Sequence, residues 1–172
     1  MYREAKNRVG SEDWQPAQRV EELACRLVAL ASETGTPEEA GFSEKLVSIL
    51  MEIPYFRENP SDIRVADALG HSRARNVVAV VRGEGRKTLA LTGHYDTVSV
   101  TNYHELAGLS REPHALKEAL IDDLSSRELN AQEKKALDDL VSGDFLPGRG
   151  MLDMKSGLAA GIAVLERFAG LA

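Results

Sequence analysis

The sequence predicts an α/β layered domain, and two patterns lead to this prediction. In the first third of the chain, apolar residues recur at helical spacing, at Val20, Leu23, Leu27 and Leu30. Short apolar runs that are typical of strands follow, at residues 63–68, 76–81 and 89–92. Helices followed by closely spaced strands indicate layers of helix packed on sheet.

Two helices are expected before the first strand. Pro16 suits the first turn of a helix that ends near residues 32–37. Thr36 then acts as a cap, with Pro37 at the first position and acidic residues behind it, so a second helix is expected to run to about Met51. The prolines and the asparagine within residues 54–60 predict a loop after this helix.

The strands and the last helix follow from hydrophobic patterning. Residues 76–81 are nearly all valine and alanine, which is typical of a strand covered on both faces. Residues 89–92 form the next predicted strand, and both are expected to be central and buried. Residues 155–172 are expected to form one amphipathic helix.

Residues 101–144 differ in character and predict a helical insert outside the sheet. The segment is rich in charge and has helical patches at residues 115–124 and 130–141. Asn130 and Glu133 have the spacing of a capping box at the start of the second patch.

Composition limits the classes of protein that need to be considered. With 172 residues, 43% hydrophobic and 28% charged, the chain suits one globular domain. A formal net charge of -6 argues against nucleic-acid binding, and no apolar run approaches the ~20 residues that cross a bilayer. Residues 1–15 predict an irregular polar lead-in, and residues 1–20 lack the apolar core of a secretory signal. Cys25 is the only cysteine, which excludes an internal disulfide, and a cytoplasmic location is the simplest interpretation. Cys25 itself is expected to be a buried, inert thiol.

The first group of candidate site residues lies at residues 93–98, directly after the predicted strand at 89–92. His94 at the carboxyl end of a strand would face the ligand crevice of an α/β sheet. Asp96, two residues on, would lie on the same side and accept the second ring N–H of the imidazole. A histidine in this place is also commonly a hydrogen-bonded structural residue.

The second group lies at residues 146–157, where three glycines surround Arg149, Asp153 and Lys155. Asp153 comes just before the predicted last helix. It is interpreted either as a site carboxylate or as a plain helix N-cap, which is a common use of aspartate. Arg149 and Lys155 are open to the simpler interpretation of solvated charges. A phosphate-binding loop does not fit the glycine and lysine spacing.

Together these elements resemble the two-metal peptidases and deacylases that include aminoacylase, glutamate carboxypeptidase, acetylornithine deacetylase and succinyl-diaminopimelate desuccinylase. The Gly-His-x-Asp-x-Val and Gly-Arg-Gly-x-x-Asp-Met-Lys-x-Gly elements are similar to that family's first two site motifs, in the same order. The resemblance implies a three-layer α/β/α fold with a mixed, mostly parallel sheet, incomplete at the C-terminus, in which residues 1–172 form the N-terminal part of a catalytic domain. The long insert resembles the branch linked to bacterial arginine utilisation.

The resemblance also implies roles for three residues. His94 would bind one metal ion, Asp153 would bridge two, and Asp96 would orient His94. The ions would be zinc, with manganese or cobalt as alternatives. The peptide bond between Asp153 and Met154 is expected to be cis, and His94 and Asp153 are expected to converge. Substrates would be small peptides or N-acyl amino acids, without nucleic-acid or membrane partners, and a full-length parent would be a homodimer.

The chain departs from the family pattern at its end. The family's Glu-Glu pair, later metal ligands and second domain have no counterpart in residues 155–172. The expectation is therefore a metal-dependent amide hydrolase present as an N-terminal fragment, inactive by itself. Two alternatives remain open: a non-catalytic binding or interaction module derived from the family, and an unrelated α/β domain with chance matches.

Overall fold

The structure is a computed structural model that describes residues 14–70 and 74–171. Its helices are α2 (Pro16–Ala29), α3 (Pro37–Ala40), α4 (Phe42–Leu50), α5 (Pro54–Glu58), α6 (Pro113–Ser125), α7 (Ala131–Ser142) and α8 (Ser156–Ala169). Short helical turns are η1 (Pro60–Asp62), η2 (Thr101–Leu109) and η3 (Met151–Lys155), and the strands are β1 (Ile63–Asp67) and β2 (Arg75–Ala79). The predicted lead-in at residues 1–15 falls almost entirely outside the described residues.

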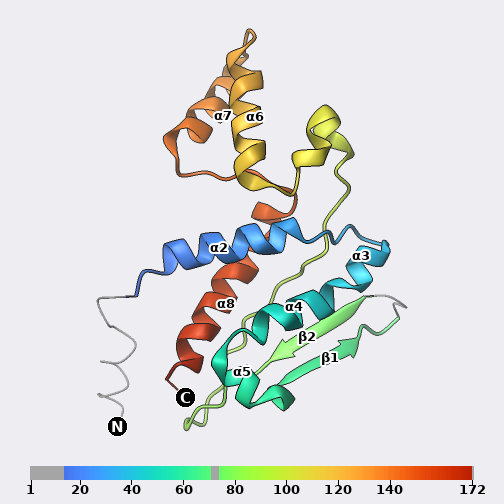
Figure 1. Cartoon of the computed structure of the whole chain (residues 1–172), viewed down its shortest axis with the longest axis vertical. Coiled ribbons are helices and arrows are strands. Elements are labelled where there is room, and N and C mark those ends of the chain that lie inside the picture. Colours follow the sequence, from blue (N-terminus) through green and yellow to red (C-terminus); the bar gives the residue numbers. More distant parts are fainter. Residues whose placement is uncertain (1–13, 71–73, 172) are drawn as a thin grey trace.

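Helix α2 confirms the first predicted helix and crosses α8 (Figure 1). Pro16 occupies its first turn, and its buried face consists of Leu23, Ala24, Leu27 and Val28. The two helices are also joined by an ion pair, in which Arg19 Nε lies 2.8 Å from Glu166 Oε2. The apolar stripe of the sequence therefore became the core-facing side of α2.

The second predicted helix begins as expected but is divided. The Thr36 side chain accepts a hydrogen bond from the Glu39 amide, and Pro37 stands in the first turn of α3. Gly41 separates α3 from α4, which ends at Leu50. The loop predicted for residues 54–60 is wrong: α5 and η1 form there instead, each with a proline in its first turn.

Strand and helix together confirm the α/β class, but the sheet is smaller than expected. Strands β1 and β2 are antiparallel, with a register that runs from the Ile63–Ala79 pair to the Asp67–Arg75 pair. The connection between them is short, and only an antiparallel pair allows this, because parallel strands need a long crossover. Among the described residues, the sheet thus has neither the mostly parallel strands nor the three clear layers that the resemblance implied.

The prediction that both central strands are buried is wrong. Val78 is 50% exposed and Val80 41%, so β2 is covered on one face only, by α4. Residues 89–92 form no strand, and Leu89 is 80% exposed and Leu91 58%. A strand needs a ladder partner, and no backbone–backbone hydrogen bond joins this segment to the rest of the described chain.

The segment at residues 101–144 is helical and contributes no residue to the sheet. Helices α6 and α7 pack on each other and project away from α2 and α8 (Figure 1). The capping box is confirmed. The Asn130 side chain accepts a hydrogen bond from the Glu133 amide, and the Glu133 carboxylate accepts one from the Asn130 amide.

The hydrophobic core lies between α2, α4, α5 and α8, and its largest fully buried apolar side chains are Phe42, Phe56, Leu23 and Leu27. Cys25 is only partly buried, which corrects the expectation of a buried thiol. Its Sγ lies 3.8 Å from His114 Nε2, and partial burial raises the pKa of the thiol, which keeps it protonated.

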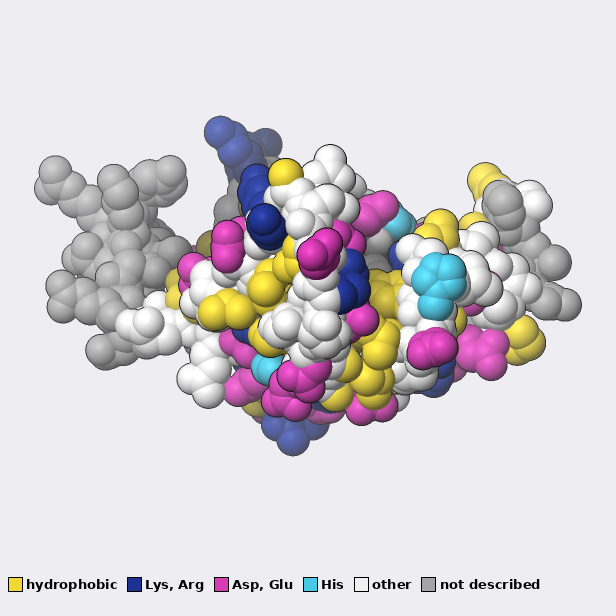
Figure 2. Space-filling view, turned by 90° about the horizontal axis from the view of Figure 1, so that it is seen from above, with side chains coloured by type: hydrophobic (Ala, Val, Ile, Leu, Met, Phe, Trp, Pro, Cys, Tyr) yellow, Lys and Arg dark blue, Asp and Glu magenta, His cyan; other side chains and the backbone are white. Residues whose placement is uncertain are grey.

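The surface carries charges of both signs. Figure 2 shows a face on which acidic side chains are spread among hydrophobic and basic ones, without one broad basic area. Within residues 14–70 and 74–171, no helix is long and apolar enough to span a membrane.

Candidate functional site

The segment that carries His94 is held from its buried side. The Thr97 amide donates to the Ser32 carbonyl at 2.9 Å, and the Thr34 amide donates to the Thr97 carbonyl at 2.9 Å. The Tyr95 ring stacks on Phe42 with 4.5 Å between ring centroids. Since side chains alternate along an extended backbone, Tyr95 points into the core while His94 and Asp96 lie on the exposed side.

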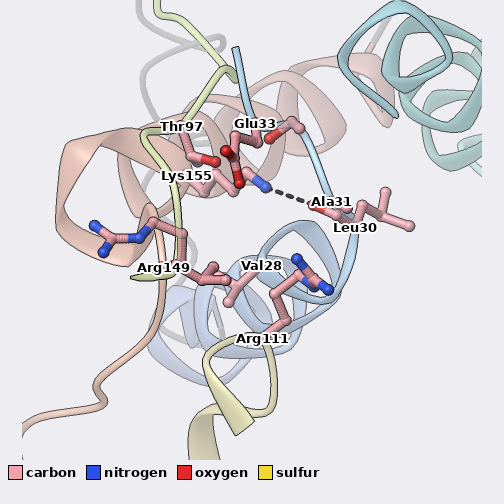
Figure 3. Close-up of a pocket in the computed structure, with 10 residues that line it drawn as sticks. Val28, Leu30, Ala31, Glu33, Thr97, Arg111, Arg149 and Lys155 are labelled. Atoms are coloured by element: carbon pink, nitrogen blue, oxygen red, sulfur yellow. Dashed lines mark hydrogen bonds between the residues drawn. The ribbon is translucent and has the colours of Figure 1, made fainter. Parts of the chain in front are cut away.

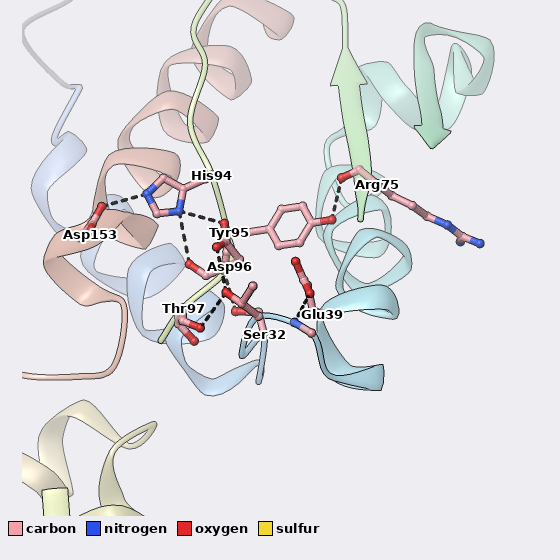
Figure 4. A network of polar contacts seen from close by, with 10 residues as sticks. Ser32, Glu39, Arg75, His94, Tyr95, Asp96, Thr97 and Asp153 are labelled. Atoms are coloured by element: carbon pink, nitrogen blue, oxygen red, sulfur yellow. Dashed lines mark hydrogen bonds and ion pairs between the residues drawn. The ribbon is translucent and has the colours of Figure 1, made fainter. Parts of the chain in front are cut away.

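His94 lies between two carboxylates, as Figure 4 shows. Its Nε2 is 2.9 Å from Asp153 Oδ1, and its Nδ1 is 3.2 Å from Asp96 Oδ1. The structure thus brings His94 and Asp153 together across 59 positions of sequence. The metal-binding roles of the three residues stay a prediction.

The carboxylates change the acid–base behaviour of His94. The hydrogen bond that the His94 ring donates to the Asp153 carboxylate, together with the charge of Asp96, raises the pKa of the His94 imidazole above its usual value. A metal ion needs the neutral imidazole nitrogen, so an ion at Nε2 would compete with a proton there.

Asp96 has a second partner that sequence patterns did not indicate. The Thr34 hydroxyl donates to Asp96 Oδ2 at 3.0 Å, while the other carboxylate oxygen faces His94. Both oxygens of Asp96 are therefore engaged, which suits an orienting role. Thr34 and Asp96 are 62 positions apart, so no local signal in the sequence pairs them.

Asp153 lies on a compact loop before α8. The loop is closed by a hydrogen bond of 2.8 Å from the Lys155 amide to the Gly150 carbonyl. The peptide bond between Asp153 and Met154 is cis, as the resemblance implied. The alternative that Asp153 is the N-cap of α8 is wrong, because Lys155 occupies that position and Asp153 has non-helical dihedral angles. The Asp153 side chain is 84% exposed and points toward His94.

Lys155 anchors the same loop in the core, so its interpretation as a solvated charge is wrong. The residue is 1% exposed, and its ammonium donates to the Leu30 carbonyl at 2.7 Å (Figure 3). The ammonium also lies 4.9 Å from the centroid of the Phe42 ring. Burial lowers the pKa of Lys155 to about 8.

The donor set fits part of a metal site. An imidazole and a carboxylate, both accessible, are ligands that zinc takes up. Within the described part of the chain, however, no group of three or more His, Cys, Asp or Glu side chains is arranged to hold an ion. At this site the three side chains do not converge on one point, because Asp96 and Asp153 face opposite nitrogens of the His94 ring.

Two known proteins are similar to this chain. Protein RocB of Bacillus subtilis (strain 168) is 32% identical over 156 residues, which is 89% of this chain. The uncharacterized protein YqjN of the same organism is 32% identical over 155 residues, or 90% of this chain. The chain spans only about a quarter of the length of these relatives, 26% of RocB and 27% of YqjN.

The other comparisons found nothing. No protein-family model matches the chain, and no solved structure matches it. The similarity to RocB and YqjN therefore links the chain to these proteins, and their names do not state an activity.

Proposed function

We propose that this chain is the N-terminal part of a metal-dependent hydrolase that cleaves amide bonds in small peptides or N-acyl amino acids. The observation that carries the proposal is the convergence of His94 Nε2 and Asp153 Oδ1 at 2.9 Å, with His94 Nδ1 directed at Asp96. A histidine whose second nitrogen faces a carboxylate is the usual form of a metal-ligating histidine.

Each residue of the group has a distinct part in this proposal. His94 would supply Nε2 to an ion, and Asp153 would supply its carboxylate as a further ligand. Asp96 accepts a hydrogen bond from Nδ1–H, which selects the tautomer with a free Nε2 and keeps the ring in place. Two bound divalent ions, zinc in the first instance and manganese or cobalt as alternatives, would activate a water and polarise the scissile carbonyl.

The finer features of the proposal rest on the resemblance. The insert at residues 101–144 and the similarity to RocB favour the branch linked to bacterial arginine utilisation. A cytoplasmic location and a homodimeric full-length parent belong to the same proposal.

The competing function is a non-catalytic binding or interaction module of the same origin. The donor count favours this module, since His94 and Asp153 give one ion at most two protein ligands and catalytic zinc ordinarily has three. Metal-dependent turnover by the full-length parent distinguishes the two, because a module would bind substrate or partner without converting it.

The first experiment measures zinc binding to the purified chain by calorimetry. Weak binding is expected, and it should be lost in His94→Ala and in Asp153→Ala. Asp138→Ala is the matched control, because Asp138 is an exposed aspartate on α7 away from the site. Binding that survives both His94→Ala and Asp153→Ala would show that the proposed site is not the zinc site.

A further inference from the structure

The loop that carries Asp153 is held at both ends by a basic side chain. Lys155, two residues after Asp153, is anchored in the core by the Leu30 carbonyl. Arg149, four residues before Asp153, is held by a different part of the molecule, the first residues of the insert. We call residues 101–113 the insert base.

Three contacts join Arg149 to the insert base. Its Nη2 donates to the Asn102 side-chain carbonyl, and its guanidinium carbon lies 4.8 Å from the centroid of the Tyr103 ring. Its backbone amide donates to the Ser110 carbonyl at 2.7 Å. A planar guanidinium that both stacks and donates is held in one orientation, which a lysine cannot reproduce.

The packing around Arg149 leaves little room for the loop to move. A Cβ placed on the preceding Gly148 would lie 3.0 Å from Val28 Cγ1 and 3.7 Å from Pro113 Cγ. The cavity beside Arg149, shown in Figure 3, has an accessible volume of about 10 Å³, enough for one water-sized molecule. The loop is therefore confined between α2 and the insert base.

We propose that Arg149 is a positioning residue: the insert base holds Arg149, and Arg149 keeps the loop of residues 148–155 where Asp153 meets His94. This gives the insert a role in the site although none of its residues reaches His94. If Arg149 has this role, its replacement should weaken metal binding and should loosen the loop. The effect on metal binding rests on the proposed function, whereas the effect on the loop does not.

The zinc affinity of the purified chain tests the effect of Arg149 on metal binding. Loss of an outer partner of a metal ligand commonly weakens binding by ~10–100-fold. Arg149→Lys and Asn102→Leu should each weaken zinc binding by about tenfold. The double variant should bind zinc no more weakly than Arg149→Lys alone, because Asn102 acts through Arg149. Asn102→Asp should retain wild-type affinity, since it keeps the acceptor oxygen.

Arg111→Lys is the matched control. Arg111 also belongs to the insert base and lines the same cavity, and its side chain has no hydrogen-bond or ion-pair partner among the described residues. Its positive charge acts on Lys155, and Arg111→Lys keeps that charge. Its substitution should leave zinc affinity unchanged. Equal effects of Arg149→Lys and Arg111→Lys, or additive effects of Arg149→Lys and Asn102→Leu, would overturn the proposal.

Amide exchange without metal separates this inference from the proposed function. In Arg149→Lys the Lys155 amide, which is bonded to Gly150, should exchange several-fold faster, while amides in the buried part of α2 should be unchanged. If the wild-type chain binds no zinc at His94, the proposed function fails and this measurement still decides the role of Arg149. Unchanged exchange at Lys155 would overturn the positioning role whatever the zinc result.

Discussion

Replacement of Gly150 by alanine should destabilise the chain strongly, and two separate terms give the magnitude. Gly150 has φ +77°, a left-handed conformation that costs a residue with a Cβ about 1–2 kcal/mol. The new Cβ would also lie 2.5 Å from Thr97 Cγ2. Thr97 is buried and tied by its backbone to residues 32 and 34, so relief of this overlap should cost a further ~1–3 kcal/mol. The expected loss is therefore about 2–5 kcal/mol of unfolding free energy.

Urea denaturation of the purified chain measures this loss, and two other glycines separate the terms. Gly143 has φ +93° with open space around its Cβ position, so Gly143→Ala should cost only the backbone term of about 1–2 kcal/mol. Gly85 has neither constraint, and Gly85→Ala should not destabilise the chain. The reasoning is refuted if Gly150→Ala is no more destabilising than Gly143→Ala.

Three further predictions concern the core, acid stability and activity. Phe42→Ala should lower the unfolding free energy by ~3–5 kcal/mol in the same denaturation assay, because the ring is fully buried against Tyr95. A loss below about 1 kcal/mol, as for a surface substitution, would contradict this packing. The hydrogen bonds from Arg82, and then from Tyr55, lower the pKa of Asp62 in the folded state. In the unfolded chain the aspartate pKa is about 3.9, so below neutral pH the folded state binds fewer protons than the unfolded chain. The free energy of unfolding should therefore fall as pH drops through the folded-state pKa. Unfolding curves between pH 2 and 5 should show less of this acid sensitivity in Asp62→Asn, and an unchanged pH profile would count against the pair. Under the proposed function, the 172-residue polypeptide with added zinc should not hydrolyse N-acyl amino acids or dipeptides, whereas a full-length parent should lose activity on chelation and regain it with zinc, manganese or cobalt. Metal-dependent turnover by the polypeptide alone would mean that another of its residues completes the site.

Local sequence signals were sufficient for helices α2 and α7 and for the start of α3. The stripe of α2, the cap at Thr36 and the capping box of Asn130 and Glu133 all appear in the structure where they were expected. These features depend on contacts between residues at most four positions apart, so the sequence contains them almost completely. The division at Gly41 and the short helices α5 and η1 depend on packing and escaped the same signals.

Strands show the limit of such signals. Residues 89–92 have a clear strand pattern, yet they pair with no strand among the described residues. A strand is completed by hydrogen bonds to a partner that is distant in sequence, and hydrophobic patterning says nothing about whether that partner is present.

The chemistry of the candidate site divides in the same way. By itself, the sequence determined which side chains are available: an imidazole and a carboxylate two residues apart, and a second carboxylate within a glycine-rich loop before a helix. Only the tertiary structure decided that His94 lies against Asp153, that Thr34 holds Asp96, and that Lys155 is buried while Arg149 is held by the insert base. The physical reason is that residue type and spacing determine which polar side chains are present and how the local backbone runs. Contacts across tens of positions exist only once the core of α2, α4 and α8 has brought those segments together.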